Sequence, residues 1–272
     1  MRILDGAELA GFIKARQITQ VRALRQAWQV SPKLAIIQTI NEPVVDMYVG
    51  LKQAYGEDIL IDVDVHKVEQ RAVRDLIKQL NEDELVHGII VQLPLADPSQ
   101  TDEVVNLIAP EKDVDGLGTD ATMTPATALA IEWLLAGYNV TLKGRQLAIV
   151  GNGRLVGAPL YKLWSGMGLD VRVYDDTVGD LTRPLRSAEV VVTATGVPGL
   201  IRSAMLRPGA VVVDAGTSTE NGKIVGDTAA DVRERDDLII TPIRGGVGPL
   251  TVTALFDNVI QAARIVADAK QL

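Results

Sequence analysis

The segment at residues 147–159 constrains the fold more than any other part of the chain. It reads LAIVGNGRLVGAP, which predicts a buried strand, a turn on Gly151 and Gly153, and a helix that begins near Leu155. A second strand is expected at residues 171–174. In such a unit the first glycine permits a tight turn, the second lets a pyrophosphate approach the backbone, and the helix N–H groups face the phosphates.

The glycine spacing of this turn is loose, Gly-x-Gly-x-x-x-Gly, and alone it is a weak signal. Glycine turns between a strand and a helix also occur for purely steric reasons, so a structural turn is the alternative. Asp175 follows the second strand, about 20 residues after the turn, where an acid suits a free ribose 2′-hydroxyl. With strand, helix and acid together, we expect dinucleotide binding.

Short apolar runs alternate with amphipathic stretches along all 272 residues, as in parallel strands joined by helices. We therefore predict an α/β fold of two α/β lobes with a cleft between them, the C-terminal lobe being a Rossmann-type domain. The expected N-terminal domain spans residues 1–121, with 251–272 packing back on it, and the dinucleotide domain spans 122–250. Strands are expected at 33–38, 59–65, 88–93, 146–150, 171–174, 190–194, 210–214 and 238–241, and helices at 7–28, 44–55, 72–80, 125–136 and 251–269.

Composition excludes several kinds of chemistry. The chain has no cysteine and only His66 and His87, so we expect no disulfide, no metal site and no Ser-His triad. A net charge of −8 argues against a nucleic-acid surface. No run reaches ~18 unbroken apolar residues and the N-terminus lacks a signal-peptide pattern, so we expect a cytoplasmic protein without membrane contact. Its expected partners are small molecules and other copies of the chain.

Four polar side chains of the first half are candidates for a site. Tyr48 and Lys52 are four residues apart on an expected helix and project from one face, although a solvated lysine beside a half-buried tyrosine is the simpler reading. Gln92 ends an apolar strand, where a side chain can enter a cleft or merely terminate the strand. Asp113 and Asp115 lie on the same side of an extended chain, where they would attract a cation or N–H groups, or form a solvated turn.

Residues 241–251 form an unusually specified loop before the last helix. The sequence TPIRGGVGPLT contains three glycines and two prolines. Prolines make such a loop stiff, and glycines let a ligand approach its backbone closely. A loop that only connects two elements rarely needs so many glycines and prolines.

Together these segments resemble one family, the bifunctional methylenetetrahydrofolate dehydrogenase/cyclohydrolases. The similarity runs nearly from end to end and is carried by the motifs ILDG (3–6), YVGLK (48–52), GIIVQLPL (88–95), KDVDG (112–116), KIVGD (223–227) and GGVGPLT (245–251). The resemblance implies oxidation of 5,10-methylenetetrahydrofolate to the methenyl compound with NADP or NAD, and hydrolysis of that compound to 10-formyltetrahydrofolate. It also implies a role in one-carbon metabolism and purine biosynthesis, and a homodimer formed through the nucleotide lobe.

The resemblance assigns roles to the candidate residues. Lys52 corresponds to the key catalytic group, Tyr48 to the residue that stacks on the folate, and Gln92 to the one that positions the lysine. Asp115 corresponds to the residue that holds the pterin. The implied further substrate contacts are Val91, Leu93, Gly245, Gly246 and Pro249, and the implied cofactor contacts are Gly151, Asn152, Gly153, Arg154, Asp175, Asp176 and Thr217.

The nucleotide turn departs from the family pattern. Asn152-Gly153 stands where the family usually has Arg-Ser, whose arginine helps hold the 2′-phosphate of NADP, and Asp175-Asp176 stands where a polar pair is common. Acids there repel a 2′-phosphate and accept hydrogen bonds from a 2′-hydroxyl. We therefore expect a preference for NAD, with Arg154 and Arg172 as the alternative partners for a phosphate.

The folate side also departs from the pattern, at Val45, at residues 122–125 (TMTP) and at Arg244. The first two changes remove small polar groups near the expected site, and Arg244 either binds the glutamate tail of folate or lies in solvent. We expect both activities. The alternatives are a dehydrogenase without cyclohydrolase turnover, a non-catalytic module that binds folate or dinucleotide, and a two-lobed dehydrogenase of the shikimate or amino-acid type.

Overall fold

Parallel sheets organise the chain into two compact units in the computed structural model, which describes residues 1–220 and 223–269. Unit 1 comprises Met1–Ala10 and Thr127–Thr251, and unit 2 comprises Gly11–Ala126 and Val252–Leu272, described as far as Ala269. The α/β fold class is thus confirmed. The division differs from the expected one chiefly in residues 1–10, which group with unit 1.

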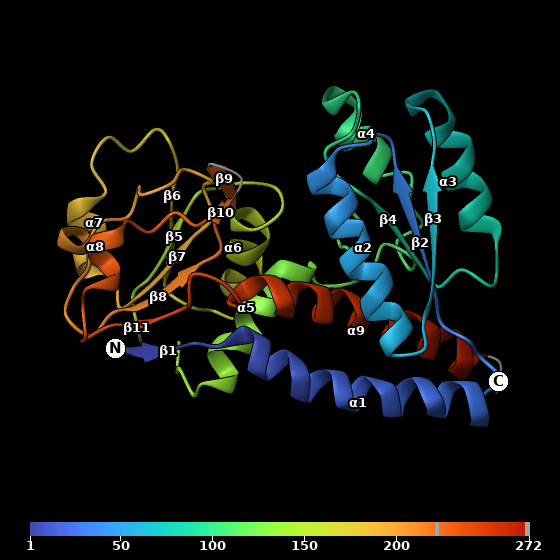
Figure 1. The fold of residues 1–272 in the computed structure, drawn as a ribbon, viewed down its shortest axis with the longest axis horizontal. Helices are drawn as coiled ribbons and strands as arrows, with labels where there is room; N and C mark the ends of the chain where they lie inside the picture. The colour runs from blue at the N-terminus through green and yellow to red at the C-terminus, as the bar shows by residue number, and fades with distance from the viewer. Residues whose placement is uncertain (221–222, 270–272) are drawn as a thin grey trace. The chain divides into compact units, whose positions relative to one another are not determined.

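Unit 1 is built on a six-stranded parallel sheet in the order β1-β11-β8-β7-β5-β6 (Figure 1). The central strands are fully buried runs such as LAIV and VVVT, the pattern of strands covered on both faces. The strands are β1 (Arg2–Ile3), β5 (Leu147–Val150), β6 (Val171–Tyr174), β7 (Val190–Thr193), β8 (Val211–Asp214) and β11 (Ile239–Ile240).

Helices and a small hairpin complete unit 1. Leu185 of α7 and Val232 of α8 belong to one buried cluster with strand residues such as Val191, so these two helices cover one face of the sheet. The helices are α5 (Ala126–Gly137), α6 (Gly157–Gly166), α7 (Thr182–Ser187), α8 (Ala230–Arg233) and the 3-10 turn η3 (Ser203–Met205), and the antiparallel hairpin is β9 (Ser218–Glu220) with β10 (Lys223–Val225).

Unit 2 is built on a three-stranded parallel sheet in the order β3-β2-β4. Val73 and Ile77 of α3 and Val104 of α4 are buried with Ile37 and Val91, so α3 and α4 cover one face. The elements are α1 (Gly6–Ala27), β2 (Lys33–Gln38), α2 (Pro43–Asp58), β3 (Asp62–Lys67), η1 (Gln70–Ala72), α3 (Val73–Glu82), β4 (Gly88–Val91), η2 (Pro98–Gln100), α4 (Thr101–Val105) and α9 (Val247–Ala269).

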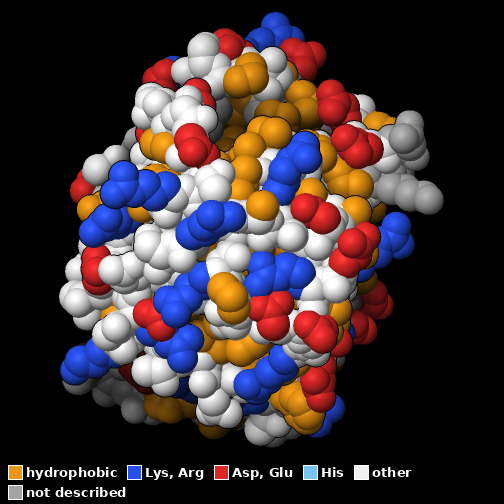
Figure 2. Space-filling view, turned by 90° about the vertical axis from the view of Figure 1, so that its left-hand side faces the viewer, with side chains coloured by type: hydrophobic (Ala, Val, Ile, Leu, Met, Phe, Trp, Pro, Cys, Tyr) orange, Lys and Arg blue, Asp and Glu red, His pale blue; other side chains and the backbone are white. Residues whose placement is uncertain are grey.

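The chain crosses between the units inside helices, because the boundaries 10/11, 126/127 and 251/252 fall within α1, α5 and α9. Helix α9 is long and apolar enough to cross a membrane, but 61% of its most apolar window is buried within the protein, as in a core helix. Figure 2 shows one face of the molecule, on which basic and acidic side chains are interspersed with apolar ones.

Several expected boundaries are wrong for identifiable reasons. The strand expected at 59–65 begins only at Asp62, because Ile59–Ile61 close the end of α2: Leu60 has φ +66° and the Ile61 N–H donates to the Gly56 carbonyl at 2.8 Å. The last helix begins at Val247 rather than Thr251, since the apolar-periodic pattern does not register its glycine-rich first turn. Strands β1, β9 and β10 have only two or three residues, too few to show a period.

Candidate active site

Lys52 and Gln92 meet in unit 2. Lys52 lies on α2, and its Nζ donates a hydrogen bond to Gln92 Oε1 at 2.9 Å. Gln92 directly follows β4; its backbone N–H donates to the Ile37 carbonyl at 2.8 Å, and its Nε2 donates to the Leu93 carbonyl at 2.9 Å. Because the amide nitrogen is occupied in this way, the amide oxygen faces the lysine.

Asp115 completes an electrostatic pair with Lys52. Burial lowers the pKa of the Lys52 ammonium below its usual value, and the nearby Asp115 charge offsets part of that effect. Burial raises the pKa of Asp115 to about 6, with Lys52 opposing the shift and Asp113 adding to it. The two groups therefore both titrate closer to neutrality than in water.

The loop that carries Asp115 is shaped by Asp113. The buried Asp113 carboxylate accepts N–H groups from its own loop, from Gly116 at 3.0 Å and from Gly118 at 2.7 Å. Gly116 has φ +69°, and a Cβ there would lie 2.8 Å from the Met123 carbonyl oxygen. The two carboxylates have different partners: Asp113 accepts N–H groups of its own loop, and Asp115 lies near the Lys52 charge. The alternative of a solvated turn is wrong for Asp113, which is buried.

Two further residues hold this loop, and sequence reasoning missed both. Lys112 Nζ donates to the carbonyls of Leu80, Asn81 and Asp83 at 2.7–3.0 Å, at the end of α3. Asn258 of α9 is buried, and its Nδ2 donates to the carbonyls of Val114 and Thr124 at 2.8 and 2.9 Å. Lys112 could have been found from the sequence, because it belongs to the KDVDG motif. For Asn258 the only indication is that an asparagine interrupts an apolar helix pattern.

The other candidates of unit 2 lie close to these residues in sequence. Tyr48 is half-buried and sits one turn before Lys52 on α2. Val91 is buried at the end of β4, and Leu93 is half-buried just beyond it. Val45 is buried on α2, so the apolar side chain at this position contributes to the core.

The nucleotide turn lies in unit 1, after β5. Gly151 has φ +98°, its N–H donates to the Tyr174 carbonyl at 2.7 Å, and a Cβ would lie 2.5 Å from the Ala194 carbonyl oxygen. A Cβ on Gly157 would lie 1.9 Å from the Gly151 carbonyl oxygen. Both positions therefore require glycine for the turn itself.

Gly153 is different, because a Cβ there would meet no atom within 4 Å. Helix α6 begins at Gly157 rather than near Leu155, since residues 154–156 complete the turn and the Ala158 N–H donates to the Gly153 carbonyl at 3.1 Å. Strand β5 lies between β6 and β7, so the sheet order changes direction there, which is where doubly wound sheets bind nucleotides. The turn therefore lies where such a sheet binds a nucleotide, and the space beside Gly153 holds no other described atom within reach of a Cβ.

The remaining cofactor candidates are exposed around this edge of the sheet: Asn152, Arg154, Asp175, Asp176 and Thr217. Asp175 Oδ1 accepts the backbone N–H of Thr177 at 3.1 Å and its hydroxyl at 2.6 Å. These hydrogen bonds hold the pKa of Asp175 below its usual value, so it carries a negative charge at neutral pH. Arg172 is exposed on β6, two residues before the strand ends.

The glycine-rich loop belongs to unit 1. Gly245 has φ +83°, and its carbonyl accepts the Ala7 N–H at 2.9 Å. A Cβ on Gly6 would lie 1.8 Å from the Gly246 carbonyl oxygen, so ILDG and GGVGPLT pack backbone against backbone. Arg244 is exposed, and Pro249 lies in the first turn of α9.

A glycine-closed turn at the switch point of a parallel sheet, and a lysine with a lowered pKa held by a glutamine, define a nucleotide-dependent α/β enzyme. Across residues 1–220 and 223–269 no group of three or more His, Cys, Asp or Glu side chains is placed to hold a metal ion. Two family models match this chain: the catalytic domain of tetrahydrofolate dehydrogenase/cyclohydrolase over residues 4–115, and its NAD(P)-binding domain over residues 125–267. The chain belongs to the tetrahydrofolate dehydrogenase/cyclohydrolase family and has both of its domains.

Known relatives agree over nearly the whole chain. The bifunctional protein FolD of Hydrogenobaculum sp. is 37% identical over 96% of this chain and 98% of its own length. The crystal structure of the bifunctional FolD enzyme of Campylobacter jejuni matches with a TM-score of 0.93 and 32% identity, covering 98% of this chain and 99% of that one. The Trypanosoma brucei enzyme, solved with NADP and an inhibitor, matches with a TM-score of 0.90 and 29% identity, covering 97% of each chain.

Proposed function

We propose that this chain oxidises 5,10-methylenetetrahydrofolate with NAD and hydrolyses the methenyl product to 10-formyltetrahydrofolate, using Lys52, Gln92 and Asp115. The observation that carries the proposal is the Lys52–Gln92 hydrogen bond of 2.9 Å beside a carboxyl group whose pKa is raised to about 6. A module that only binds folate does not need a lysine with a lowered pKa.

Asp115 is proposed to hold the pterin ring. A 2-amino-4-oxopterin presents adjacent N–H donors, and an ionised carboxylate accepts two of them in parallel. Asp113, Lys112 and Asn258 fix the loop on which Asp115 stands. Tyr48, one turn before Lys52, offers an aromatic ring for stacking on the same ligand.

In the oxidation step, the bound dinucleotide supplies the acceptor for the hydride that leaves the bridging methylene. The product is a methenyl cation. Lys52 suits this step because burial lowers its pKa, which reduces the fraction that carries a positive charge next to the developing cation.

In the hydrolysis step, the oxygen of a water molecule bonds to the methenyl carbon and gives a proton to Lys52 Nζ in its unprotonated form, which burial favours. The hydroxyl group formed in this way then loses its own proton and becomes the formyl oxygen as the bond between that carbon and N5 breaks. N5 takes up a proton and the formyl group stays on N10, so one proton is released overall. The hydrogen bond to Gln92 Oε1 holds Nζ in place for both transfers.

The test is the variant Lys52→Met. We expect cyclohydrolase turnover to fall by at least about 100-fold, because the proton acceptor is lost. The measurement is the loss of methenyl absorbance without any nucleotide, which also separates a bifunctional from a monofunctional enzyme. Lys78→Met, at an exposed position of α3, is the matched control and should keep the parent rate. Parental turnover in Lys52→Met would contradict the assignment.

The preference for NAD is proposed on charge. Asp175 and Asp176 are exposed after β6, Asp175 is held ionised, and Asn152 and Gly153 stand in the turn without a positive charge. The Trypanosoma brucei enzyme was solved with NADP, which supports the NAD(P) class without deciding between the two. A negative pair at this point repels a 2′-phosphate.

Initial rates with the two nucleotides test this preference, and the parent enzyme should have the higher kcat/KM with NAD. The double variant Asp175→Ser, Asp176→Ser should gain about tenfold in kcat/KM with NADP. Asp180→Asn, an exposed acid farther along the same loop, should gain nothing. A parent enzyme that prefers NADP would overturn the proposal.

We also propose that the enzyme is a cytoplasmic homodimer formed through unit 1 that serves one-carbon metabolism and purine biosynthesis. Light scattering on the purified protein tests the assembly, which should have twice the chain mass of 29.2 kDa.

A further inference from the structure

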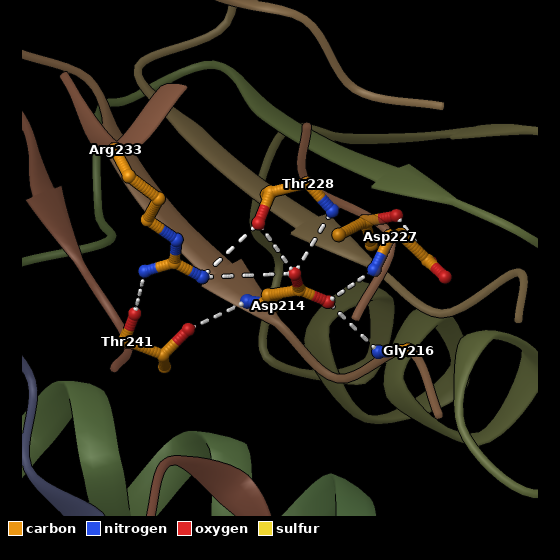
Figure 3. Close-up of polar contacts among 7 residues, drawn as sticks. Asp214, Gly216, Asp227, Thr228, Arg233 and Thr241 are labelled. Carbon is orange, nitrogen blue, oxygen red and sulfur yellow. Dashed lines mark hydrogen bonds and ion pairs between the residues drawn. The ribbon is translucent and has the colours of Figure 1, made fainter. Parts of the chain in front are cut away.

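Two carboxylates that the proposed chemistry does not use lie at the carboxyl edge of the unit 1 sheet (Figure 3). Asp214 is the last residue of β8, and Asp227 follows the short strand β10. The Asp214 side chain is 4% exposed, and Asp227 is fully buried. Buried carboxylates are costly, so their partners identify what they hold together.

Asp214 joins two backbone segments. Its Oδ1 accepts the N–H groups of Gly216 at 3.1 Å and Asp227 at 3.0 Å. Its Oδ2 accepts the N–H of Thr228 at 2.9 Å and the hydroxyl of Thr228 at 2.7 Å. Arg233 adds a charge at 3.8 Å from Oδ2 and also donates to the Thr228 hydroxyl oxygen at 3.0 Å. Asp214 therefore ties the loop after β8 to the turn at residues 227–228.

Asp227 extends the connection to the next loop. Its Oδ2 accepts the Thr193 hydroxyl at 2.6 Å and the Thr195 N–H at 2.7 Å, just after β7. Its Oδ1 is buried and, among the described residues, has no hydrogen-bond partner. A buried acceptor left without a donor costs free energy. The hydrogen bonds of Oδ2 offset this cost and hold the side chain in its position.

Two glycines make room for the two acids. A Cβ on Gly216 would lie 2.0 Å from Asp227 Oδ1, and a Cβ on Gly226 would lie 2.3 Å from Asp214 Oδ2. Each acid therefore lies against the glycine of the other segment: Asp227 against Gly216, and Asp214 against Gly226. We call this arrangement of four residues the Asp214–Asp227 interlock. Any larger side chain at either glycine would displace a carboxylate.

The interlock is connected to the nucleotide turn. Asp227 holds residues 193–195, and the Ala194 carbonyl oxygen is the atom that a Cβ on Gly151 would meet at 2.5 Å. Asp214 holds Gly216, the residue directly before Thr217. The first loop follows β7, which is next to β5, and the second follows β8, which is next to β7, so both lie at the same carboxyl edge of the sheet as the turn.

We propose that Asp227, with Asp214, is a positioning residue that sets the geometry of the dinucleotide site by fixing the loops at 194–197 and 215–217. The inference rests on the proposed use of a dinucleotide and concerns residues that do not touch the folate site of unit 2. It assigns a function in cofactor binding to the aspartate of the KIVGD motif.

The test compares Asp227→Ala with Asp227→Asn. The alanine variant leaves the Thr195 N–H and the Thr193 hydroxyl without their acceptor, so the Kd for NAD should rise about tenfold or more, as expected for loops displaced by a fraction of an ångström. Asparagine keeps one acceptor oxygen for these donors, so its Kd should stay within about threefold of the parent value. The Kd is measured by titration of NAD in the absence of folate.

Two readouts separate positioning from a merely structural role. Cyclohydrolase turnover without nucleotide should stay at the parent rate in both variants, because Lys52, Gln92 and Asp115 lie in unit 2. Asp231→Ala removes an exposed carboxylate of α8 that accepts the Ser203 N–H at 3.2 Å, and it should leave the Kd unchanged.

A lower melting temperature for Asp227→Ala with an unchanged Kd for NAD would overturn the proposal. Equal loss of NAD binding in the alanine and asparagine variants would also overturn it, because the acceptor oxygen would then not be the cause. If the parent itself binds no dinucleotide while it hydrolyses methenyltetrahydrofolate, the proposed dehydrogenase function fails, and this inference fails with it for that separate reason.

Discussion

Lys52 and Asp115 are two ionisable residues whose pKa values shift toward each other. Burial lowers the pKa of the ammonium and raises that of the carboxyl to about 6, and each charge partly offsets the shift of the other. The lysine can therefore exchange protons nearer neutral pH, whereas the aspartate remains mostly ionised at pH 7. These directions suit the proposed roles of the two residues, Lys52 as a proton acceptor and Asp115 as a fixed negative charge.

A pH dependence follows from Asp115. Below a pH of about 6 the carboxyl group is protonated and can no longer accept the two pterin N–H groups that we propose it binds. The KM for the folate substrate should therefore rise about tenfold between pH 7 and pH 5. In Asp115→Asn the KM should be high at pH 7 and should change little with pH. A KM that is flat in the parent enzyme would contradict this role of Asp115.

The free energy of unfolding depends on Asp115 in the opposite direction: substrate binding should improve as pH rises, whereas the contribution of Asp115 to stability declines. The folded-state pKa of Asp115 lies above the usual 3.8, so between the two values the folded state binds a proton that the unfolded state does not bind. The contribution of Asp115 is thus most favourable in acid and is lost as pH rises through about 6. Asp115→Asn should weaken this decline in the free energy of unfolding, as measured by urea titration at pH 5 and pH 7.5.

At the level of elements, the turn between β5 and α6 contains glycines that the backbone requires and one that it does not require. Gly151 and Gly157 are required by the backbone, because a Cβ at either position would lie within 2.5 Å of a carbonyl oxygen. Gly153 is not required in this way, since its Cβ would meet no atom within 4 Å. A role for Gly153 therefore has to come from a ligand that approaches the backbone.

The variants Gly151→Ala and Gly153→Ala form a matched pair. Gly151→Ala should lower the free energy of unfolding by more than about 1 kcal/mol, because φ is +98° and the methyl group overlaps Ala194. Gly153→Ala should leave stability within about 0.5 kcal/mol of the parent and weaken NAD binding. Urea unfolding and NAD titration measure both effects. Parental NAD affinity in Gly153→Ala would show that the pyrophosphate does not approach this residue.

At the scale of the whole molecule, each unit has its own parallel sheet, and the proposed catalytic residues and the nucleotide turn fall into different units. Lys52, Gln92 and Asp115 belong to unit 2, whereas the glycine turn and the Asp214–Asp227 interlock belong to unit 1. Hydrolysis of the methenyl compound uses no dinucleotide, so substitutions at the nucleotide turn and at the proposed catalytic residues can be told apart by which activity they change.

The sequence by itself determined the α/β class, most strands and helices, the nucleotide turn and the identity of Lys52, Gln92 and Asp115 as candidates. These features depend on neighbours along the chain: the period of apolar residues, the glycines of a turn and the four-residue step from Tyr48 to Lys52. The errors at this scale concern where elements begin and end. The strand expected from Ile59 begins only at Asp62, because the apolar run Ile59–Ile61 closes the end of α2 instead.

Only the tertiary structure decided which polar groups became partners. Asn258 holds Val114 across 144 residues, Thr193 donates to Asp227 across 34, and Lys112 reaches Leu80 across 32. No local pattern encodes such pairs, because a hydrogen bond depends on where the chain brings donor and acceptor together in space. For the same reason the sequence did not show that Asp113 accepts N–H groups of its own loop whereas Asp115 lies near Lys52.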